Sequence, residues 1–356
     1  HNGQDITGAT NSSFTVTNAR RDQAGQYRVA VSNSIGAVTS RLATLSVVNV
    51  AAWGNTNYGL TTVLPASLTN TLGIAIGYYH SLALTSDGNV VGWGHYSDGT
   101  NVPAGLTNVI AVAGGSYASS RLVLTGESRL IRWGANPSVS PPADLTNAVA
   151  SSVGGYHIIS LRSDGTVKVW GLSDPVLLNL PPNLTNTVAV SAGQEHNLIL
   201  KSDGTLVAWG YNSRGQTNIP NGLDQVVAIA AGQNHNLALR ANGKVTAWGD
   251  NFLGQSDVPA DLTNVVAISA GGSQSLALKD DGSVVVWGWS GMTNIPVGLT
   301  NVIAVAAGGV HSLALIGDAP PVQQALQVNP TWNSSGFSVN VPTQSGRVYR
   351  LEYKDT

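Results

Sequence analysis

The stretch WGDNFLGQSDVPADLTNVVAISAGGSQSLALKDDGSVVVWG, residues 248–288, is one complete unit of a repeat that organises most of the chain. Each unit carries a Trp-Gly pair, a run of small and β-branched residues such as VVAISAG, and a run that ends in Leu-Ala-Leu or close to it. The tryptophan of the pair recurs 37 to 40 residues apart, at Trp53, Trp93, Trp133, Trp170, Trp209, Trp248 and Trp287. Seven such units fill residues 48–317 of the 356-residue chain.

Each unit predicts three short β-strands and no helix. The second and third apolar runs alternate, as half-buried strands do, and no stretch keeps a helical period. Asp-Gly or Asn-Gly lies between these two runs, and such pairs favour a type I′ hairpin turn. The pairs are Asp87-Gly88, Asp164-Gly165, Asp203-Gly204, Asn242-Gly243 and Asp281-Gly282. A β-solenoid has shorter coils, so a period near 40 predicts an all-β fold, a seven-bladed β-propeller.

The two ends of the repeat region complement each other. VNVAAWG at residues 48–54 is a third strand without its first two, whereas NVIAVAAGGVHSLALI at residues 301–316 has the first two strands and lacks the third. We expect these segments to pair, because that pairing completes one blade and closes the ring without exposed strand edges.

The repeat resembles a known family. Its pattern, VVAIAAG-x-x-H-S/N-LAL-x-x-DG-x-VVAWG-x-N-x-x-GQ, is similar to the bacterial form of the regulator-of-chromosome-condensation repeat, and the short blades resemble those of propeller-type β-lactamase-inhibitory proteins. The resemblance covers about 270 residues. It implies a seven-bladed propeller that serves as a binding platform and is not an enzyme.

The segments outside the repeats predict parts of other domains. We divide the chain into residues 1–47, residues 48–318 as the propeller, and residues 319–356 as a linker and the start of a further β-domain. The first segment resembles the end of an immunoglobulin-like domain, with Asp22, Gly25 and Tyr27 as its corner motif and Val29 where a disulfide-bonded domain has cysteine. We interpret the chain as an internal fragment of a modular bacterial protein that is secreted or at the cell surface.

Composition argues against several classes of function. The chain has 17 basic and 19 acidic residues, with no block of Lys or Arg, so nucleic acid and anionic membranes are poor partners. It has no cysteine, which excludes disulfides, thiolate metal sites and a cysteine nucleophile. No apolar run approaches the roughly 20 residues of a membrane-spanning helix, so we expect no membrane insertion.

Histidines recur at one position of the repeat and could suggest a shared metal ion. We favour the simpler interpretation that each begins the second strand and bonds to a loop backbone, because no carboxylate recurs beside them. The repeated tryptophans are interpreted as packing between blades, with the indole N–H satisfied. The residues at the histidine position are expected to be His80, Ala118, His157, His196, His235, Gln274 and His311.

The variable loops are expected to share one face of the propeller. The first strand ends at the Gly-x-x-His loop and the third ends at Trp-Gly, so antiparallel strands place both loops at one end. Exposed aromatic residues among small polar ones are typical of protein-binding surfaces, although the loops could instead pack only on each other. The candidate partner-binding residues are Tyr58, Tyr78, Tyr79, His95, Tyr96, Asp98, Tyr117, Tyr156, Tyr211, Asp250, Phe252 and Trp289; Arg214 lies in the same loops.

Three functional classes remain open on the sequence. The favoured one is a non-enzymatic protein-binding module; the alternatives are a secreted inhibitor of the β-lactamase-inhibitory type and a carbohydrate-binding propeller. No G-x-S-x-G, H-E-x-x-H or P-loop pattern occurs, so we expect no catalytic residues, no metal and no cofactor. We expect the propeller to be monomeric, with another protein, or alternatively a glycan, on its loop face.

Overall fold

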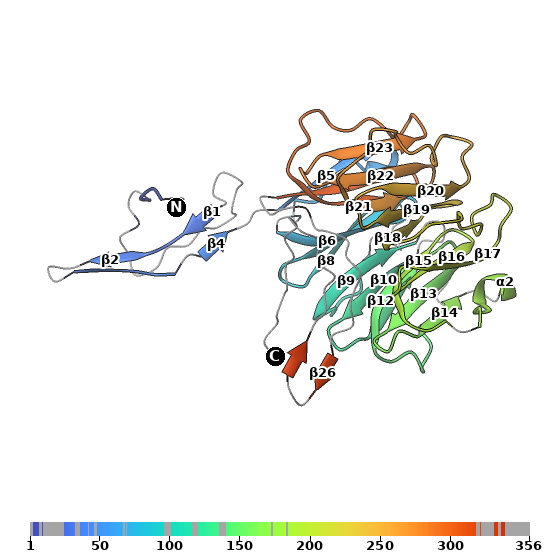
Figure 1. Ribbon diagram of the computed structural model, residues 1–356. Helices are drawn as coiled ribbons and strands as arrows, with labels where there is room; N and C mark the ends of the chain where they lie inside the picture. Colours follow the sequence, from blue (N-terminus) through green and yellow to red (C-terminus); the bar gives the residue numbers. More distant parts are fainter. Residues whose placement is uncertain are drawn as a thin grey trace.

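Antiparallel β-strands dominate the part of the chain that the computed structural model describes (Figure 1). The only helical elements there are η2 (Asn57–Gly59) and α2 (Pro175–Leu178). No helix in these residues is long and apolar enough to cross a membrane. The described residues are 3–6, 9, 25–32, 36–41, 43–45, 48–66, 68, 70–95, 101–115, 120–134, 140–171, 174–182, 184–317, 321, 331–333 and 336–338.

The described residues form seven three-stranded sheets, each with the middle strand of the repeat at its centre. Six sheets are built from consecutive strands, and the seventh combines the two ends of the repeat region. The sheets are β6 (Thr71–Ile76), β7 (His80–Thr85) and β8 (Val90–Gly94); β9 (Val109–Gly114), β10 (Ser120–Thr125) and β11 (Leu130–Gly134); β12 (Ala148–Val153), β13 (His157–Arg162) and β14 (Val167–Gly171); β15 (Thr187–Ala192), β16 (His196–Lys201) and β17 (Leu206–Gly210); β18 (Val226–Ala231), β19 (His235–Arg240) and β20 (Val245–Gly249); β21 (Val265–Ala270), β22 (Gln274–Lys279) and β23 (Val284–Gly288); and β24 (Val302–Ala307), β25 (His311–Ile316) and β5 (Asn49–Gly54).

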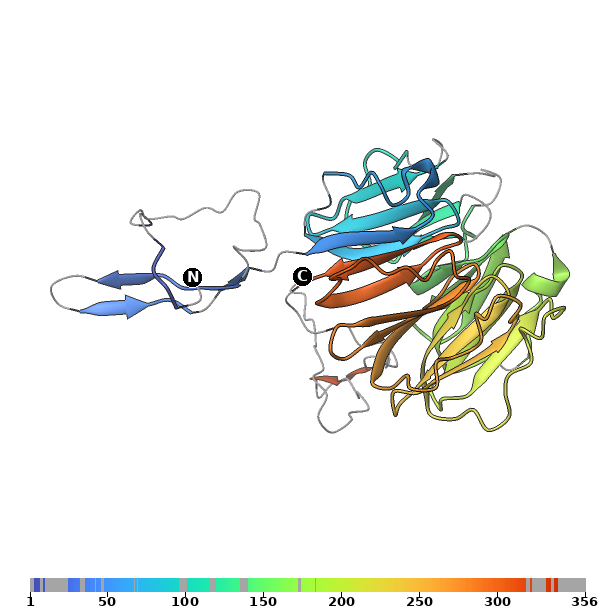
Figure 2. The ribbon, with the colours of Figure 1, turned by 90° about the horizontal axis from the view of Figure 1, so that it is seen from above.

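The first and last repeat segments lie side by side in the seventh sheet (Figure 2). β5 pairs antiparallel with β25, from Gly54 opposite His311 to Asn49 opposite Ile316. Asn55 continues the ladder, because its N–H donates to the carbonyl of Val310 at 2.9 Å. The first strand of this sheet, β24, contacts both β21 and β6, the corresponding strands of the sheets on either side.

Outside the repeats, only short strand pairs are described. β1 (Gly25–Tyr27) pairs with β4 (Ala43–Leu45), β2 (Ala30–Ser32) with β3 (Ala37–Thr39), and β26 (Thr331–Asn333) with β27 (Gly336–Ser338). Asp22 lies outside the described residues. The immunoglobulin-like interpretation therefore stays a prediction.

The turn between the second and third strands differs from the expected type I′ turn. That turn needs a positive φ at both central residues, but in the Asp87-Gly88 turn only Gly88 has one, at 79°. The turn is closed by the Gly88 N–H, which donates to the carbonyl of Thr85 at 2.9 Å. The aspartate acts through its side chain instead: in the next such turn, Asp164 Oδ1 accepts from the backbone N–H of Thr166 at 2.9 Å. This side-chain bond stabilises a longer turn.

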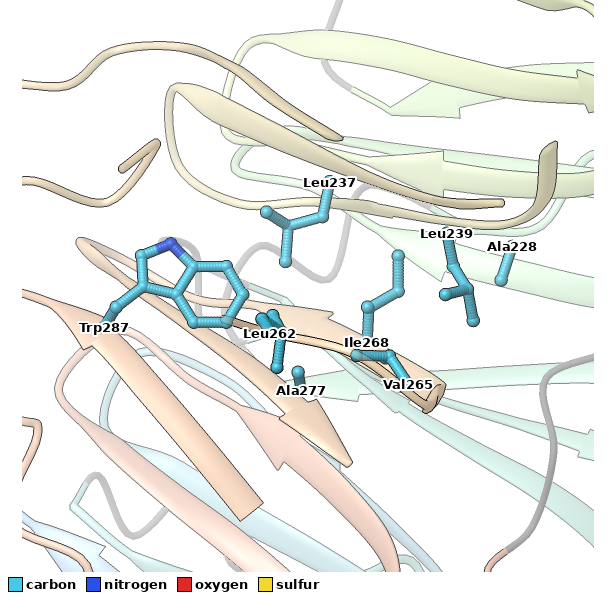
Figure 3. Close-up of a cluster of buried hydrophobic side chains, with 8 residues drawn as sticks. All are labelled: Ala228, Leu237, Leu239, Leu262, Val265, Ile268, Ala277 and Trp287. Atoms are coloured by element: carbon cyan, nitrogen blue, oxygen red, sulfur yellow. The ribbon is translucent and has the colours of Figure 1, made fainter. Parts of the chain in front are cut away.

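The repeated tryptophans hold neighbouring sheets together. Trp287 on β23 packs with Leu237 and Leu239 of β19, and Ile268 of β21 lies in the same cluster (Figure 3). The other six tryptophans occupy equivalent clusters, and all seven are no more than 9% exposed. Trp93 on β8 packs against Leu313 of β25, which joins the seventh sheet to the first. The interpretation of the tryptophans as packing between sheets is confirmed.

The expectation that each indole N–H is satisfied holds only in part. Trp93 donates to the carbonyl of Leu60 at 3.2 Å, and Trp248 donates to that of Gln216 at 3.1 Å. In both cases the acceptor belongs to the loop that enters the sheet from its neighbour. Among the described residues, the indole nitrogens of Trp53, Trp133 and Trp287 have no hydrogen-bond partner.

Three of the five buried histidines, His196, His235 and His311, bond to side chains of the next sheet, not to a loop backbone as expected. His196 Nε2 lies 2.8 Å from Asn236 Oδ1, and His311 Nε2 lies 2.7 Å from Ser81 Oγ. Among the described residues, His80 Nε2 and both ring nitrogens of His157 have no hydrogen-bond partner. Four histidines, His80, His157, His196 and His235, pack tightly on the glycine three positions before them: a Cβ on Gly77 would lie 1.8 Å from the His80 ring. The described residues contain no group of three or more His, Cys, Asp or Glu side chains that could hold a metal ion.

One position of the histidine series is corrected by the structure. The strand-pairing register places Ser120, not Ala118, opposite the Trp-Gly glycine in the third unit. The preceding loop is two residues longer there, because the bond from Gly115 N–H to the Ser120 carbonyl corresponds to that from Gly77 to His80. Ala118 itself lies outside the described residues.

We call the seven tryptophans that are buried between sheets the wedge tryptophans. We predict that replacing one of them destabilises the protein far more than replacing an exposed aromatic residue. Trp248→Ala leaves a cavity between sheets and should cost about 3–5 kcal/mol of unfolding free energy. Phe252→Ala, at an 85% exposed residue, should change it by no more than about 0.5 kcal/mol. Urea unfolding followed by circular dichroism measures both. Similar losses for the two variants would contradict the wedge role.

We also predict that the protein loses stability as the pH falls from about 6.5 to 4. Burial lowers the pKa of His157, His196 and His311 to about 4 and that of His235 to about 3. The unfolded chain, with histidines near 6.5, therefore binds more protons in this range, which favours unfolding as the pH drops.

The matched control for the pH prediction comes from the chain itself. Gln274 occupies the histidine position in one sheet and donates to the carbonyl of Gly308 at 3.0 Å. His196→Gln should therefore fold, and the slope of unfolding free energy against pH between 6.5 and 4.5 should be shallower than in the parent. An unchanged slope would show that other groups cause the acid sensitivity.

Candidate functional site: the loop face

The two variable loops of each repeat meet at one end of the sheets. His95, after a Trp-Gly pair, donates its backbone N–H to the carbonyl of Tyr79 in the Gly-x-x-His loop at 2.8 Å. The same bond joins Asp250 to Asn234 and Trp289 to Ser273, each at 2.9 Å. We call this end, formed by the Gly-x-x-His loops and the loops after Trp-Gly, the loop face. The Asp-Gly turns lie at the opposite strand ends.

Several predicted aromatic residues on the loop face are exposed to solvent. Phe252 is 85% exposed, and Tyr211, Trp289 and Tyr156 are 41%, 40% and 38% exposed. They come from four consecutive sheets, those centred on β13, β16, β19 and β22. The loop face therefore presents separate aromatic side chains over a broad arc.

Other predicted residues have a different place or lie outside the description. Tyr96, Asp98 and Tyr117 are not among the described residues, nor is the side chain of Tyr58. His95 is half-buried, and its ring centroid lies 6.0 Å from that of Tyr79 in an edge-on arrangement.

Tyr78 and Tyr79 have a packing role that the sequence did not reveal. Their rings meet edge to face, with centroids 4.5 Å apart, and both pack on a cluster of Leu60, Met292 and Val310. This cluster covers the junction between the seventh sheet and the first. A Cβ on residue 309, which is glycine, would lie 2.4 Å from Tyr78 Cδ2, so the ring needs that glycine.

Two loops of the face share one hydrogen-bonded frame, which we call the Asn-Gln frame. In the loop of residues 211–218, Asn212 Oδ1 accepts from the Thr217 N–H at 3.0 Å, and Gln216 Oε1 accepts from the Arg214 N–H at 2.8 Å. In residues 250–257, Asn251 and Gln255 make the equivalent bonds to Ser256 and Leu253, at 2.9 and 2.8 Å.

The Asn-Gln frame determines which side chains are displayed. Gln216 and Gln255 are buried below the loops, whereas Ser213 and Phe252 occupy equivalent tips. Asp250, predicted to bind a partner, also stabilises its own loop: Oδ2 accepts from Gln255 Nε2 at 3.0 Å. The hydrogen bonds of the Asn-Gln frame are thus the same in the two loops, whereas the residue at the exposed tip differs, Ser213 in one and Phe252 in the other.

Asp174 and Glu195 join the loop face without having been singled out from the sequence. Asp174 caps α2, since Oδ1 accepts from the Val176 N–H at 2.9 Å, and Oδ2 accepts from the Tyr211 hydroxyl at 3.1 Å. The bond to Asp174, its charge and that of Glu195 raise the pKa of Tyr211. The Asp-Pro pair at the start of α2 is a helix-start signal that could have identified this cap.

Backbone hydrogen bonds between sheets hold the inner parts of the loops. Gly155 donates to the carbonyl of Gln194 at 3.0 Å, and Gln194 donates to that of Gln233 at 3.1 Å. The equivalent bond at the junction runs from Gly309 to Gly77, at 3.1 Å. Among the described residues, these bonds connect loops from the sheet centred on β13 round to the first sheet, and they give this part of the loop face a rigid base.

Four stretches of the chain match the regulator of chromosome condensation (RCC1) repeat: residues 73–99, 188–216, 226–255 and 265–292. No curated protein matches the chain.

Solved structures share the architecture at low sequence identity. Prp20p from Saccharomyces cerevisiae is 19% identical with a TM-score of 0.61, over 76% of this chain and 91% of that chain. A chain in the structure of Kap60 bound to yeast RCC1 (Prp20) is 18% identical with a TM-score of 0.62, over 88% and 96%. The CRINKLY WD40 ectodomain of the Arabidopsis thaliana receptor kinase ACR4 is 25% identical with a TM-score of 0.53, over 72% and 98%. Four stretches of this chain thus match the RCC1 repeat, and the described residues fold into repeated three-stranded antiparallel sheets like the blades of RCC1 propellers.

Proposed function

We propose that the chain is a closed, seven-bladed propeller that acts as a non-enzymatic protein-binding module, with the loop face as its contact surface. The observation that carries this proposal is the Asn-Gln frame, which holds Phe252 at 85% exposure on a hydrogen-bonded loop. An exposed phenylalanine is unfavourable in water, and a loop of fixed conformation loses little entropy when that ring enters a partner's pocket.

The surroundings of Phe252 fit a protein contact. Tyr211 and Trp289, on the sheets to either side, are also exposed, and aromatic residues dominate the energetics of protein interfaces. Half-buried Asp174 and Glu195 add negative charge beside Tyr211. Such a surface, aromatic with acidic neighbours, would contact a partner through a few anchor residues.

The structural relatives support a binding role without naming the partner here. The structure of Prp20p is described with its binding to Gsp1p and histones, and Kap60 is seen bound to yeast RCC1. For this chain we propose a protein partner, a secreted or cell-surface location in a modular bacterial protein, and the three-domain division given above. These proposals come from the sequence pattern and its resemblance.

We predict that binding depends on Phe252 and not on exposed apolar residues in general. Phe252→Ser copies Ser213, which holds the equivalent tip in the other Asn-Gln frame, so the loop should keep its conformation. Loss of an anchor costs about 2 kcal/mol or more, or roughly a 30-fold weaker Kd. The control is Val297→Ser, because Val297 is fully exposed in the connection that leads into β24.

The measurement has two stages. Proteins of the source organism are captured on the immobilised full chain and identified by mass spectrometry, and the Kd of each candidate is measured by calorimetry with the parent and both variants. A partner whose Kd weakens with Phe252→Ser but not with Val297→Ser supports the proposal. Equal affinity for all three chains, or binding only to a glycan array, would contradict it.

A further inference from the structure

The flanking segments leave the repeat region side by side. At one end of the β5–β25 pair, Asn49 stands opposite Ile316, and these are the last paired residues before each segment departs. The next residues also lie close, because a Cβ on Gly317 would be 3.4 Å from Val48 Cγ2. A pull on the two flanks is therefore applied across the same pair of residues.

We propose that β5 and β25 form a tension-sensitive clasp, which opens when the two flanking segments are pulled apart. Tension between the flanks loads the ladder at Asn49 and Ile316 first, so its backbone hydrogen bonds break one after another. Each bond contributes little net free energy in water, because water competes for the same groups, and successive loading lets a low force break them all. A pull along the strand axis would load them together and need a higher force.

This clasp is particular to the seventh sheet. In the other six sheets a short turn links the middle strand covalently to the third, such as Thr85–Asn89 between β7 and β8. β5 has no such link to β25, since they stand at opposite ends of the repeat region. Among the described sheets, only this one can lose its third strand to tension between the flanks.

Opening the clasp would change two surfaces. The outer edge of β25 would lose its partner, and an unpaired edge is a template for adding a strand from another chain. Trp53 would leave its cluster with Leu276 and Leu278 of β22. Beyond Gly54 the chain runs to Leu60, which packs beneath Tyr78 and Tyr79, so the pull also reaches the loop face.

Optical tweezers test the clasp on the full chain. For end-to-end pulling, DNA handles are attached enzymatically through short peptide tags fused at both chain ends. For axial pulling, the second tag is inserted instead after Ser290, an exposed loop-face residue at the far end of the strands. Release of the six residues of β5 should add about 20 Å of contour length. We expect this first step at a several-fold lower force in end-to-end pulling than in axial pulling.

A disulfide lock is the matched control. Because the chain has no cysteine, the two introduced thiols can pair only with each other within one chain. Asn49→Cys with Ile316→Cys joins the residues where peeling starts, and paired antiparallel residues have Cα separations that a disulfide can span. The oxidised lock should abolish the early 20 Å step, and a reductant should restore it. Equal forces in the two geometries, or an early step that persists in the oxidised lock, would overturn the proposal. Unchanged circular dichroism of both forms confirms that the lock itself folds.

Discussion

The insertion of one indole between each pair of neighbouring sheets is the contact on which the rest of the structure depends. A three-stranded sheet has two faces to cover, and its middle strand is buried at nearly every position, as in β7. The tryptophan of each third strand covers the leucines of the preceding middle strand, and this contact also crosses the junction, from Trp93 to Leu313. No single sheet could exclude water from both of its faces, so the units are stable only together.

The same contact gives the loop face its rigidity. Trp248 and Asn236 both donate to the carbonyl of Gln216, the buried residue of an Asn-Gln frame. The loop that displays Tyr211 and Ser213 is therefore hydrogen-bonded to Trp248, the wedge tryptophan of the next sheet. Small glycines before each histidine let the loops approach one another closely, and backbone bonds then join them. A loop surface built in this way can vary the residues at its tips without disturbing its base.

The junction between the seventh sheet and the first has the same parts as the other contacts between sheets. The bond between His311 and Ser81 repeats that between His196 and Asn236, and Gly309 donates to Gly77 as Gly155 does to Gln194. What differs is the connectivity, because β5 reaches its sheet from the other end of the repeats. The junction thus has the same packing as the other contacts between sheets, but its strands β5 and β25 come from opposite ends of the repeat region. This connectivity is why tension between the flanks would open the seventh sheet and not the other six.

The sequence by itself determined the repeat, its three strands, the role of the tryptophans and the end at which the variable loops gather. These follow from periodicity and from the alternating direction of antiparallel strands, which are local properties. It misjudged the turn at Asp87-Gly88, where side-chain hydrogen bonds stabilise a longer turn, and placed Ala118 where a loop two residues longer brings Ser120. Only the tertiary structure decided that His196, His235 and His311 bond to the next sheet, that Asp174 meets Tyr211, and that Tyr78 packs at the junction while Phe252 projects. The projection of Phe252 depends on side-chain hydrogen bonds within its own loop. The histidine bonds, the Asp174–Tyr211 bond and the packing of Tyr78 join residues about 40 or more positions apart, whose contact is determined by how the sheets pack, and no local pattern encodes that distance.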